Sequence, residues 1–136
     1  MSEGYKTILL VDDEASQGER MRRILRASGY RVVVAKDYGT AMDCFQQHPG
    51  VIDMLVTDLA LPGKNGYELN LALRGLQPKL KVLFTSAQVG AELHRFYGME
   101  ASGEHFLAKP FTPADFLGRV RYLLERAESS CGTAGG

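Results

Sequence analysis

Five short apolar runs recur along this chain and constrain its fold more than any other feature. They are rich in Val, Ile and Leu, show no polar alternation, and span residues 8–11, 32–35, 54–56, 82–84 and 106–108. Such runs are typical of strands buried on both faces of a parallel sheet. Between them, apolar residues recur every three or four positions, which predicts amphipathic helices.

Strands that alternate with helices predict an α/β fold in which helices cover both faces of the sheet. We expect a (βα)5 doubly wound, flavodoxin-like fold whose parallel five-stranded sheet has the order 2-1-3-4-5. Turn residues support the phasing, because Ser28-Gly29 closes the first helix and Thr112-Pro113 opens the last. The second run ends in Ala35-Lys36-Asp37, outside the cluster of reactive strand ends, so its strand is the predicted edge.

Length and charge favour one small domain without an overall electrostatic preference. In a chain of 136 residues we expect one domain over residues 6–126 and a flexible tail or linker remnant over 127–136. Sixteen basic and sixteen acidic side chains cancel, so bulk charge predicts no direct binding to nucleic acid or membrane. The N-terminus lacks a secretory pattern, the apolar runs are strand-sized and the cysteines lack metal or disulfide spacing, which favours a cytoplasmic location.

Acidic residues gather at the predicted carboxyl ends of the strands, where ligands bind in open α/β sheets. Asp12 and Asp13 follow the first run, and Asp58 follows the third. The first and third strands are neighbours in the predicted order, so the three carboxylates are expected in one pocket. Carboxylates crowded in this way repel one another, and a hard divalent cation relieves the repulsion. Mg²⁺ suits this inventory, whereas zinc is disfavoured because His and Cys are missing from it.

The fourth and fifth strand ends complete a set of groups suited to phosphoryl transfer. The fourth carries Thr85-Ser86 and the fifth carries Lys109. A hydroxyl and an ammonium group can both contact phosphoryl oxygens as negative charge develops on them. One carboxylate could then attack phosphorus to form an aspartyl phosphate. The chain lacks a P-loop and a Gly-x-Gly-x-x-Gly motif, so nucleotide binding is a distant alternative.

In order and spacing these residues resemble the receiver domain of bacterial two-component response regulators. The matching elements are Val11-Asp12-Asp13-Glu14, Asp58 followed by Leu61-Pro62-Gly63, Asn65-Gly66, Thr85-Ser86-Ala87, and Phe106-Leu107-Ala108-Lys109-Pro110-Phe111. Each element alone is weak, but together they are highly specific. The resemblance covers residues 6 to about 126.

The resemblance implies a phosphoacceptor and its metal ligands. Asp58 would receive a phosphoryl group from a histidine kinase or a histidine phosphotransfer protein. Asp12, Asp13 and Asp58 would hold Mg²⁺, with the main-chain carbonyl of Ala60 as a further ligand. The domain would then be a signalling module in a phosphorelay rather than an enzyme, catalysing only its own phosphorylation and dephosphorylation.

The resemblance also implies a conformational switch. Ser86 and Lys109 would bind the phosphoryl group, the Ser86 hydroxyl would move toward it, and the aromatic ring of Phe106 would swing inward. The family usually has a cis peptide bond where this chain has Lys109-Pro110. By family analogy, the fourth helix, at roughly residues 88–98, and the fifth strand form a partner or homodimer surface, although the apolar residues of that helix would equally suit a core.

Three other interpretations stay open at this point. One aspartate of the Asp12-Asp13 pair could simply cap a helix. The fold could serve as a pseudo-receiver that binds partners without phosphorylation. A phosphate-ester hydrolase is less favoured, because Ala60 stands where such enzymes carry a second aspartate. The sequence is compatible with a stand-alone regulator and with the receiver of a hybrid sensor histidine kinase, and we favour the hybrid kinase.

Overall fold

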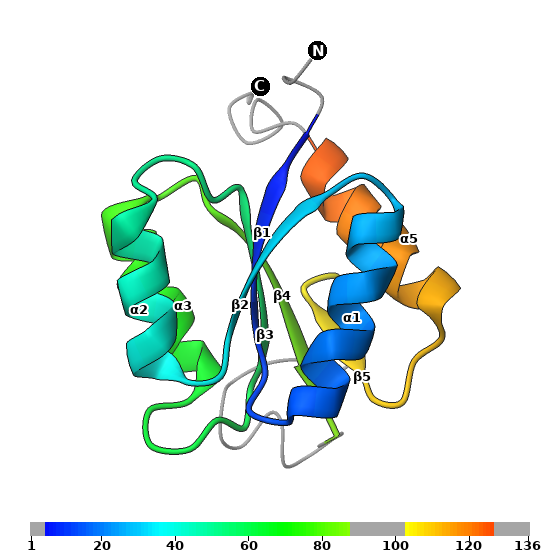
Figure 1. The fold of residues 1–136 in the computed structure, drawn as a ribbon, viewed down its shortest axis with the longest axis horizontal. Helices are drawn as coiled ribbons and strands as arrows, with labels where there is room; N and C mark the ends of the chain where they lie inside the picture. The colour runs from blue at the N-terminus through cyan, green and yellow to red at the C-terminus, as the bar shows by residue number, and fades with distance from the viewer. Residues whose placement is uncertain (1–4, 88–102, 127–136) are drawn as a thin grey trace.

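The computed structural model describes residues 5–87 and 103–126. The fourth helix and the tail predicted from the sequence lie outside these ranges. Along the chain the described elements are β1 (Thr7–Val11), α1 (Ala15–Ala27), β2 (Arg31–Ala35), α2 (Tyr38–Gln47), β3 (Met54–Asp58), α3 (Gly66–Leu76), β4 (Lys81–Ser86), β5 (Phe106–Ala108) and α5 (Pro113–Glu125) (Figure 1). Among the described residues, no helix has the length and apolar character needed to cross a bilayer.

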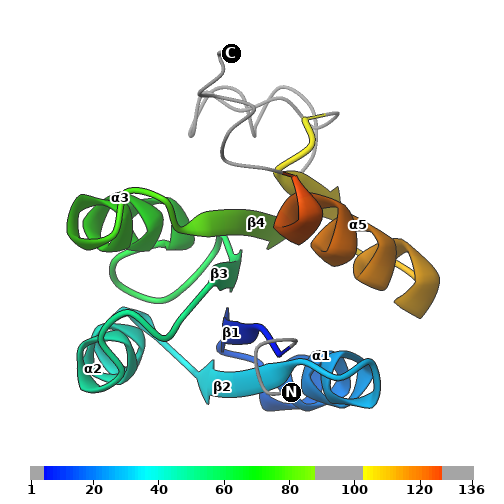
Figure 2. The same cartoon turned by 90° about the horizontal axis from the view of Figure 1, so that it is seen from above.

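The five strands form one parallel sheet in the order β2-β1-β3-β4-β5, which confirms the predicted fold class and order. β2 is an edge strand, as predicted, and β5 is the other edge. Figure 2 shows α2 and α3 on one face of the sheet and α1 and α5 on the opposite face. This arrangement buries both faces of the central strands β1, β3 and β4, which explains why their runs are apolar without alternation. The edge strand β2 is less buried than its apolar run predicts, since Val34 is exposed.

Neighbouring residues of the central strands serve two separate cores. In β1, Leu9 and Val11 pack in the core beneath α2 and α3, whereas Ile8 and Leu10 pack in the core beneath α1 and α5. All four side chains have no solvent exposure. Because side chains of a strand point to alternate faces, a run of four apolar residues supplies both cores at once.

The strands are longer than their apolar runs predicted. β3 extends to Asp58 and β4 extends to Ser86, because Thr57, Thr85 and Ser86 are polar but fully buried. The start of the last helix agrees with its prediction, since Thr112 caps α5 through its side chain and Pro113 occupies the first turn. As a result, Asp58 and Ser86 are the last residues of β3 and β4 and lie within the sheet rather than in the loops that follow it.

Replacing Gly18 by alanine is expected to stabilise the fold. Gly18 lies in α1, and an added methyl carbon would meet Val34 at 3.8 Å, an ordinary van der Waals contact. Alanine is favoured over glycine inside a helix by about 0.8–1.0 kcal/mol. Urea denaturation of Gly18→Ala should therefore give a higher free energy of unfolding than wild type. A lower value would contradict the inference that the added methyl group fits against Val34 without a clash.

Candidate functional site

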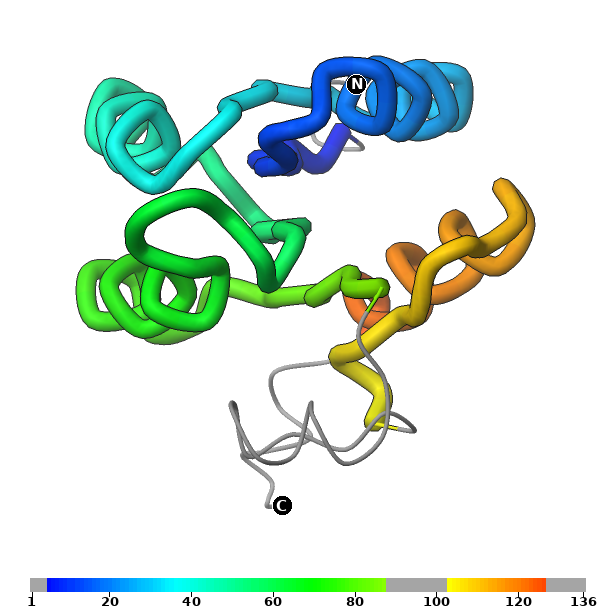
Figure 3. The backbone as a smooth tube through the Cα atoms, turned by 90° about the horizontal axis from the view of Figure 1, so that it is seen from below, coloured from blue at the N-terminus to red at the C-terminus, as the bar shows by residue number. Residues whose placement is uncertain are grey.

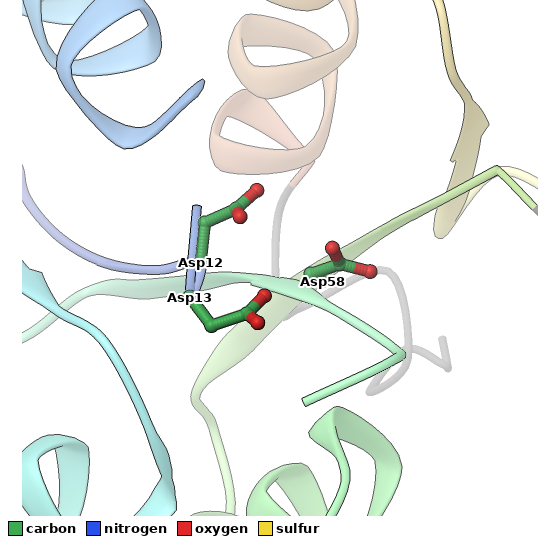
Figure 4. A group of neighbouring side chains, drawn as sticks. All are labelled: Asp12, Asp13 and Asp58. Carbon is green, nitrogen blue, oxygen red and sulfur yellow. The ribbon is translucent and has the colours of Figure 1, made fainter. Parts of the chain in front are cut away.

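The three predicted aspartates lie together at the carboxyl ends of β1 and β3. Figure 3 views the fold from this end, where the ends of the paired strands β1 and β3 are neighbours and the chain then turns away to α1 and α3. Figure 4 shows the side chains of Asp12, Asp13 and Asp58 gathered there, and one ligand oxygen from each lies within 4.8 Å of the others. Asp12 is buried, Asp58 is partly buried and Asp13 is exposed. The cluster is therefore an acidic pocket that could hold a metal ion.

The ammonium group of Lys109 bridges two of these carboxylates. Its Nζ donates to Oδ2 of Asp58 at 2.9 Å and to Oδ2 of Asp12 at 3.1 Å. The backbone N–H of Lys109 donates to the Ser86 carbonyl at 2.8 Å, which fixes the end of β5 beside β4. The Lys109-Pro110 peptide bond is cis. Strand pairing thus brings a cation from the end of β5 into the acidic pocket.

Local hydrogen bonds orient the two bridged aspartates. Oδ1 of Asp12 accepts the Glu14 N–H at 2.9 Å, and Oδ1 of Asp58 accepts the Ala60 N–H at 3.0 Å. In each carboxylate, one oxygen therefore accepts a hydrogen bond from a backbone N–H two residues further along the chain, and the other oxygen contacts Lys109. The N-cap of α1 is Glu14, without a side-chain capping hydrogen bond, so neither Asp12 nor Asp13 caps this helix and the capping interpretation is wrong.

Burial and charge act in opposite directions on the protonation of this pair. Burial raises the pKa of the Asp58 carboxyl above its ordinary value, against the hydrogen bonds from Lys109 and the Ala60 N–H. Burial would lower the pKa of Lys109, but hydrogen bonds and charge from Asp58 and Asp12 outweigh it and raise that pKa. Asp58 and Asp12 therefore keep Lys109 in its ammonium form, while burial disfavours the charged form of the Asp58 carboxyl.

A close backbone contact positions Asp58 from the start of α3. The Gly66 N–H donates to the Leu59 carbonyl at 2.9 Å, and a methyl carbon at Gly66 would lie 2.2 Å from the Asp58 carbonyl oxygen. Asn65 caps the same helix, with its side chain bonded to the Glu68 N–H at 2.8 Å. Only glycine fits at position 66 without moving the Asp58 backbone. The Asn-Gly pair was recognised in the sequence as a motif element, but not for this contact.

A pocket of about 440 Å³ opens beside Asp58 and Lys109. It is lined by Glu14, Gln17, Arg20, Asp58, Ala60, Ser86, Ala87, Lys109, Pro110 and Phe111. Sequence reasoning missed Gln17 and Arg20, because only the docking of α1 brings them to this opening. The Ser86 side chain is fully buried, and Phe106 is 1% exposed within the core beneath α2 and α3. Phe106 is thus already packed inward in this structure.

Comparison with known proteins connects this site to a family. The sequence model for the response regulator receiver domain matches residues 8–121. The transcriptional regulatory protein CpxR of Escherichia coli strain K12 is 33% identical over 123 residues, which cover 90% of this chain and 51% of CpxR. The chain therefore spans about half the length of the curated relatives it matches.

Two solved structures show the same fold with clear sequence similarity. The non-phosphorylated HemR receiver domain from Leptospira biflexa has a TM-score of 0.77 and 33% identity, covering 90% of this chain and 97% of the HemR chain. The receiver domain of the hybrid histidine kinase CckA has a TM-score of 0.71 and 31% identity, covering 88% of this chain and 99% of the other. With the family match over most of its length, this chain belongs to the response regulator receiver domains of two-component signalling.

Proposed function

We propose that this domain receives a phosphoryl group on Asp58 from a phosphohistidine of a histidine kinase or a phosphotransfer protein. The observation that carries the proposal is the bridge from Lys109 Nζ to Asp58 and Asp12, inside an acid cluster that opens to a pocket. Phosphorylation would then change the surface of the domain and regulate a partner. The partner class follows from the receiver family, not from the pocket itself.

The transfer forms one bond and breaks one. A carboxylate oxygen of Asp58 attacks phosphorus, and the P–N bond of the phosphohistidine breaks as the P–O bond forms. The imidazole nitrogen leaves with the electron pair of the broken bond. Lys109, already 2.9 Å from Asp58, offers its ammonium group to the phosphoryl oxygens, and we assign the Ser86 hydroxyl to the same oxygens.

The donor set fits Mg²⁺. Three carboxylates with ligand oxygens within 4.8 Å provide hard oxygen ligands, and the exposed Asp13 leaves room for the waters that Mg²⁺ retains. Asp12, Asp13 and Asp58 would hold the ion, and we propose the Ala60 carbonyl as a further ligand. When bound, the ion supplies positive charge that neutralises the carboxylates and the incoming phosphoryl oxygens.

The test is phosphorylation by acetyl phosphate, a small phosphodonor, with intact mass as the readout. Wild type with Mg²⁺ is expected to gain one phosphoryl group, and Asp58→Asn is expected to gain none. Asp43→Asn is the matched control, because Asp43 is an exposed aspartate of α2 and should leave the adduct unchanged. An unmodified wild type, or an adduct that persists in Asp58→Asn, would refute the proposal and favour a phosphorylation-independent interaction module.

A further inference from the structure

The outer edge of β5 is held by a side chain of α5. On the inner side, the His105 carbonyl accepts the Phe84 N–H and the Lys109 N–H donates to Ser86, both toward β4. Because bonding directions alternate along a strand, the carbonyl of Phe106 faces the outer edge, and Glu104 lies in the turn that precedes the strand. Nη1 of Arg119 donates to Glu104 O at 3.2 Å and to Phe106 O at 2.7 Å.

The side chain of Glu104 adds two more contacts between this segment and α5. Its carboxylate pairs with the guanidinium of Arg126 and accepts a hydrogen bond from the Tyr122 hydroxyl at 3.2 Å. These two contacts are partly or fully exposed, and they involve Glu104, which lies two residues before β5. Among the hydrogen bonds given for the described residues, the one from Arg119 to the Phe106 carbonyl joins a side chain of α5 to β5 itself.

Phe106 connects this hydrogen bond to the candidate site. Its side chain packs in the core beneath α2 and α3, and its backbone pairs with Phe84 of β4. Two residue pairs further along, Ser86 lies opposite Ala108, and Lys109 follows directly. A displacement of the Phe106 backbone would therefore change its hydrogen bond with Arg119 at the outer edge of β5. The same displacement would alter the surroundings of Ser86 and Lys109 at the inner edge, next to β4.

We propose that Arg119 is a positioning residue that couples the Ser86 and Phe106 end of the sheet to the surface of α5. The proposal rests on the proposed function, because phosphorylation at Asp58 is the event that would be transmitted. A competing explanation is that Arg119 only satisfies exposed carbonyls and so protects an edge strand from pairing with another chain. The two explanations differ in what α5 does when the site is occupied.

The experiment records amide NMR shifts before and after addition of Mg²⁺ and beryllofluoride, a phosphoryl mimic. Arg119→Met removes the donors but keeps the aliphatic stem, and Arg121→Met is the matched control on an exposed arginine of the same helix. Arg119→Lys keeps the charge without the planar fork. Thermal unfolding reports whether each variant is folded, and Arg119→Lys carries the test if Arg119→Met is not.

In wild type and in Arg121→Met, the amides of Ala60 and Ser86 and those of α5 should all shift. In Arg119→Met the site amides should still shift, whereas the α5 shifts should be largely lost, because the hydrogen bonds that join α5 to the Phe106 end of the sheet are removed. Arg119→Lys should give an intermediate response. Wild-type α5 shifts in Arg119→Met would overturn the coupling role, whereas site amides that do not respond in wild type would overturn the proposed function and the coupling with it.

Discussion

Replacing Gly66 by alanine is expected to lower the free energy of unfolding and to slow phosphorylation of Asp58 sharply. The added methyl carbon would lie 2.2 Å from the Asp58 carbonyl oxygen and 2.9 Å from Thr57 Oγ1, which no real structure tolerates. Overpacking of this kind costs about 1–3 kcal/mol, because the backbone or the helix must move. A shift of about 1 Å in a reacting group can reduce a rate about 100-fold.

Gly75 of the same helix provides the control for this prediction. A methyl carbon at Gly75 meets nothing within 4 Å, so Gly75→Ala should be neutral or more stable than wild type. Urea denaturation and the rate of phosphorylation by acetyl phosphate with Mg²⁺ give the two readouts. Equal behaviour of Gly66→Ala and Gly75→Ala would show that the start of α3 does not position Asp58.

Replacing Lys109 by methionine should weaken both the fold and the chemistry. The change leaves Asp12, whose side chain has no solvent exposure, and Asp58, whose side chain is 12% exposed, without their shared cation. Removing one partner of a buried charged group costs several kcal/mol when burial is complete, and about 1–3 kcal/mol is expected at this partly open site. Loss of an electrostatic contact to the transferring group should slow phosphorylation by about 10²–10³.

Added Mg²⁺ should restore part of the stability lost in Lys109→Met. A cation that binds only the folded protein stabilises it, and the acids of the variant lack their internal counterion. The rise in unfolding free energy on addition of Mg²⁺ should therefore be larger for Lys109→Met than for wild type. Lys79→Met, at an exposed lysine that precedes β4 and so lies at the opposite end of this strand from Ser86, should match wild type in stability, rate and response to Mg²⁺. A Lys109→Met variant that behaves like Lys79→Met would contradict the bridge.

The sequence predicted the parts of the site that depend on strand order alone. Asp12 and Asp13 follow the first apolar run, Asp58 follows the third after one threonine, and Lys109 follows the fifth. Once the strands are ordered, the meeting of these residues at one edge is a geometric consequence. The alternation of strands and helices predicts a parallel sheet but not its order, and 2-1-3-4-5 is the common doubly wound order that brings the acidic ends of the first and third strands together. The ends of β3 and β4 were placed too early, because buried Thr57 and Ser86 carry no apolar signal.

Contacts between elements could not be predicted in this way. The reach of Arg119 to Phe106 spans 13 residues and depends on how α5 docks at the edge of the sheet. The approach of Gly66 to Asp58 depends on the path of an intervening loop, and Gln17 reaches the pocket only through the orientation of α1. Periodicity identifies the buried face of a helix, but it does not specify which exposed side chain faces a neighbouring site.

A structure of the protein with Mg²⁺ and beryllofluoride is the most direct test of the central claim. The ion should lie among Asp12, Asp13 and Asp58, and the beryllium atom should be bonded to a carboxylate oxygen of Asp58. Lys109 Nζ and the Ser86 hydroxyl should contact the fluorine atoms of the mimic. Beryllofluoride bound at any other residue, a magnesium ion held elsewhere, or a Lys109 side chain turned into solvent would contradict the account.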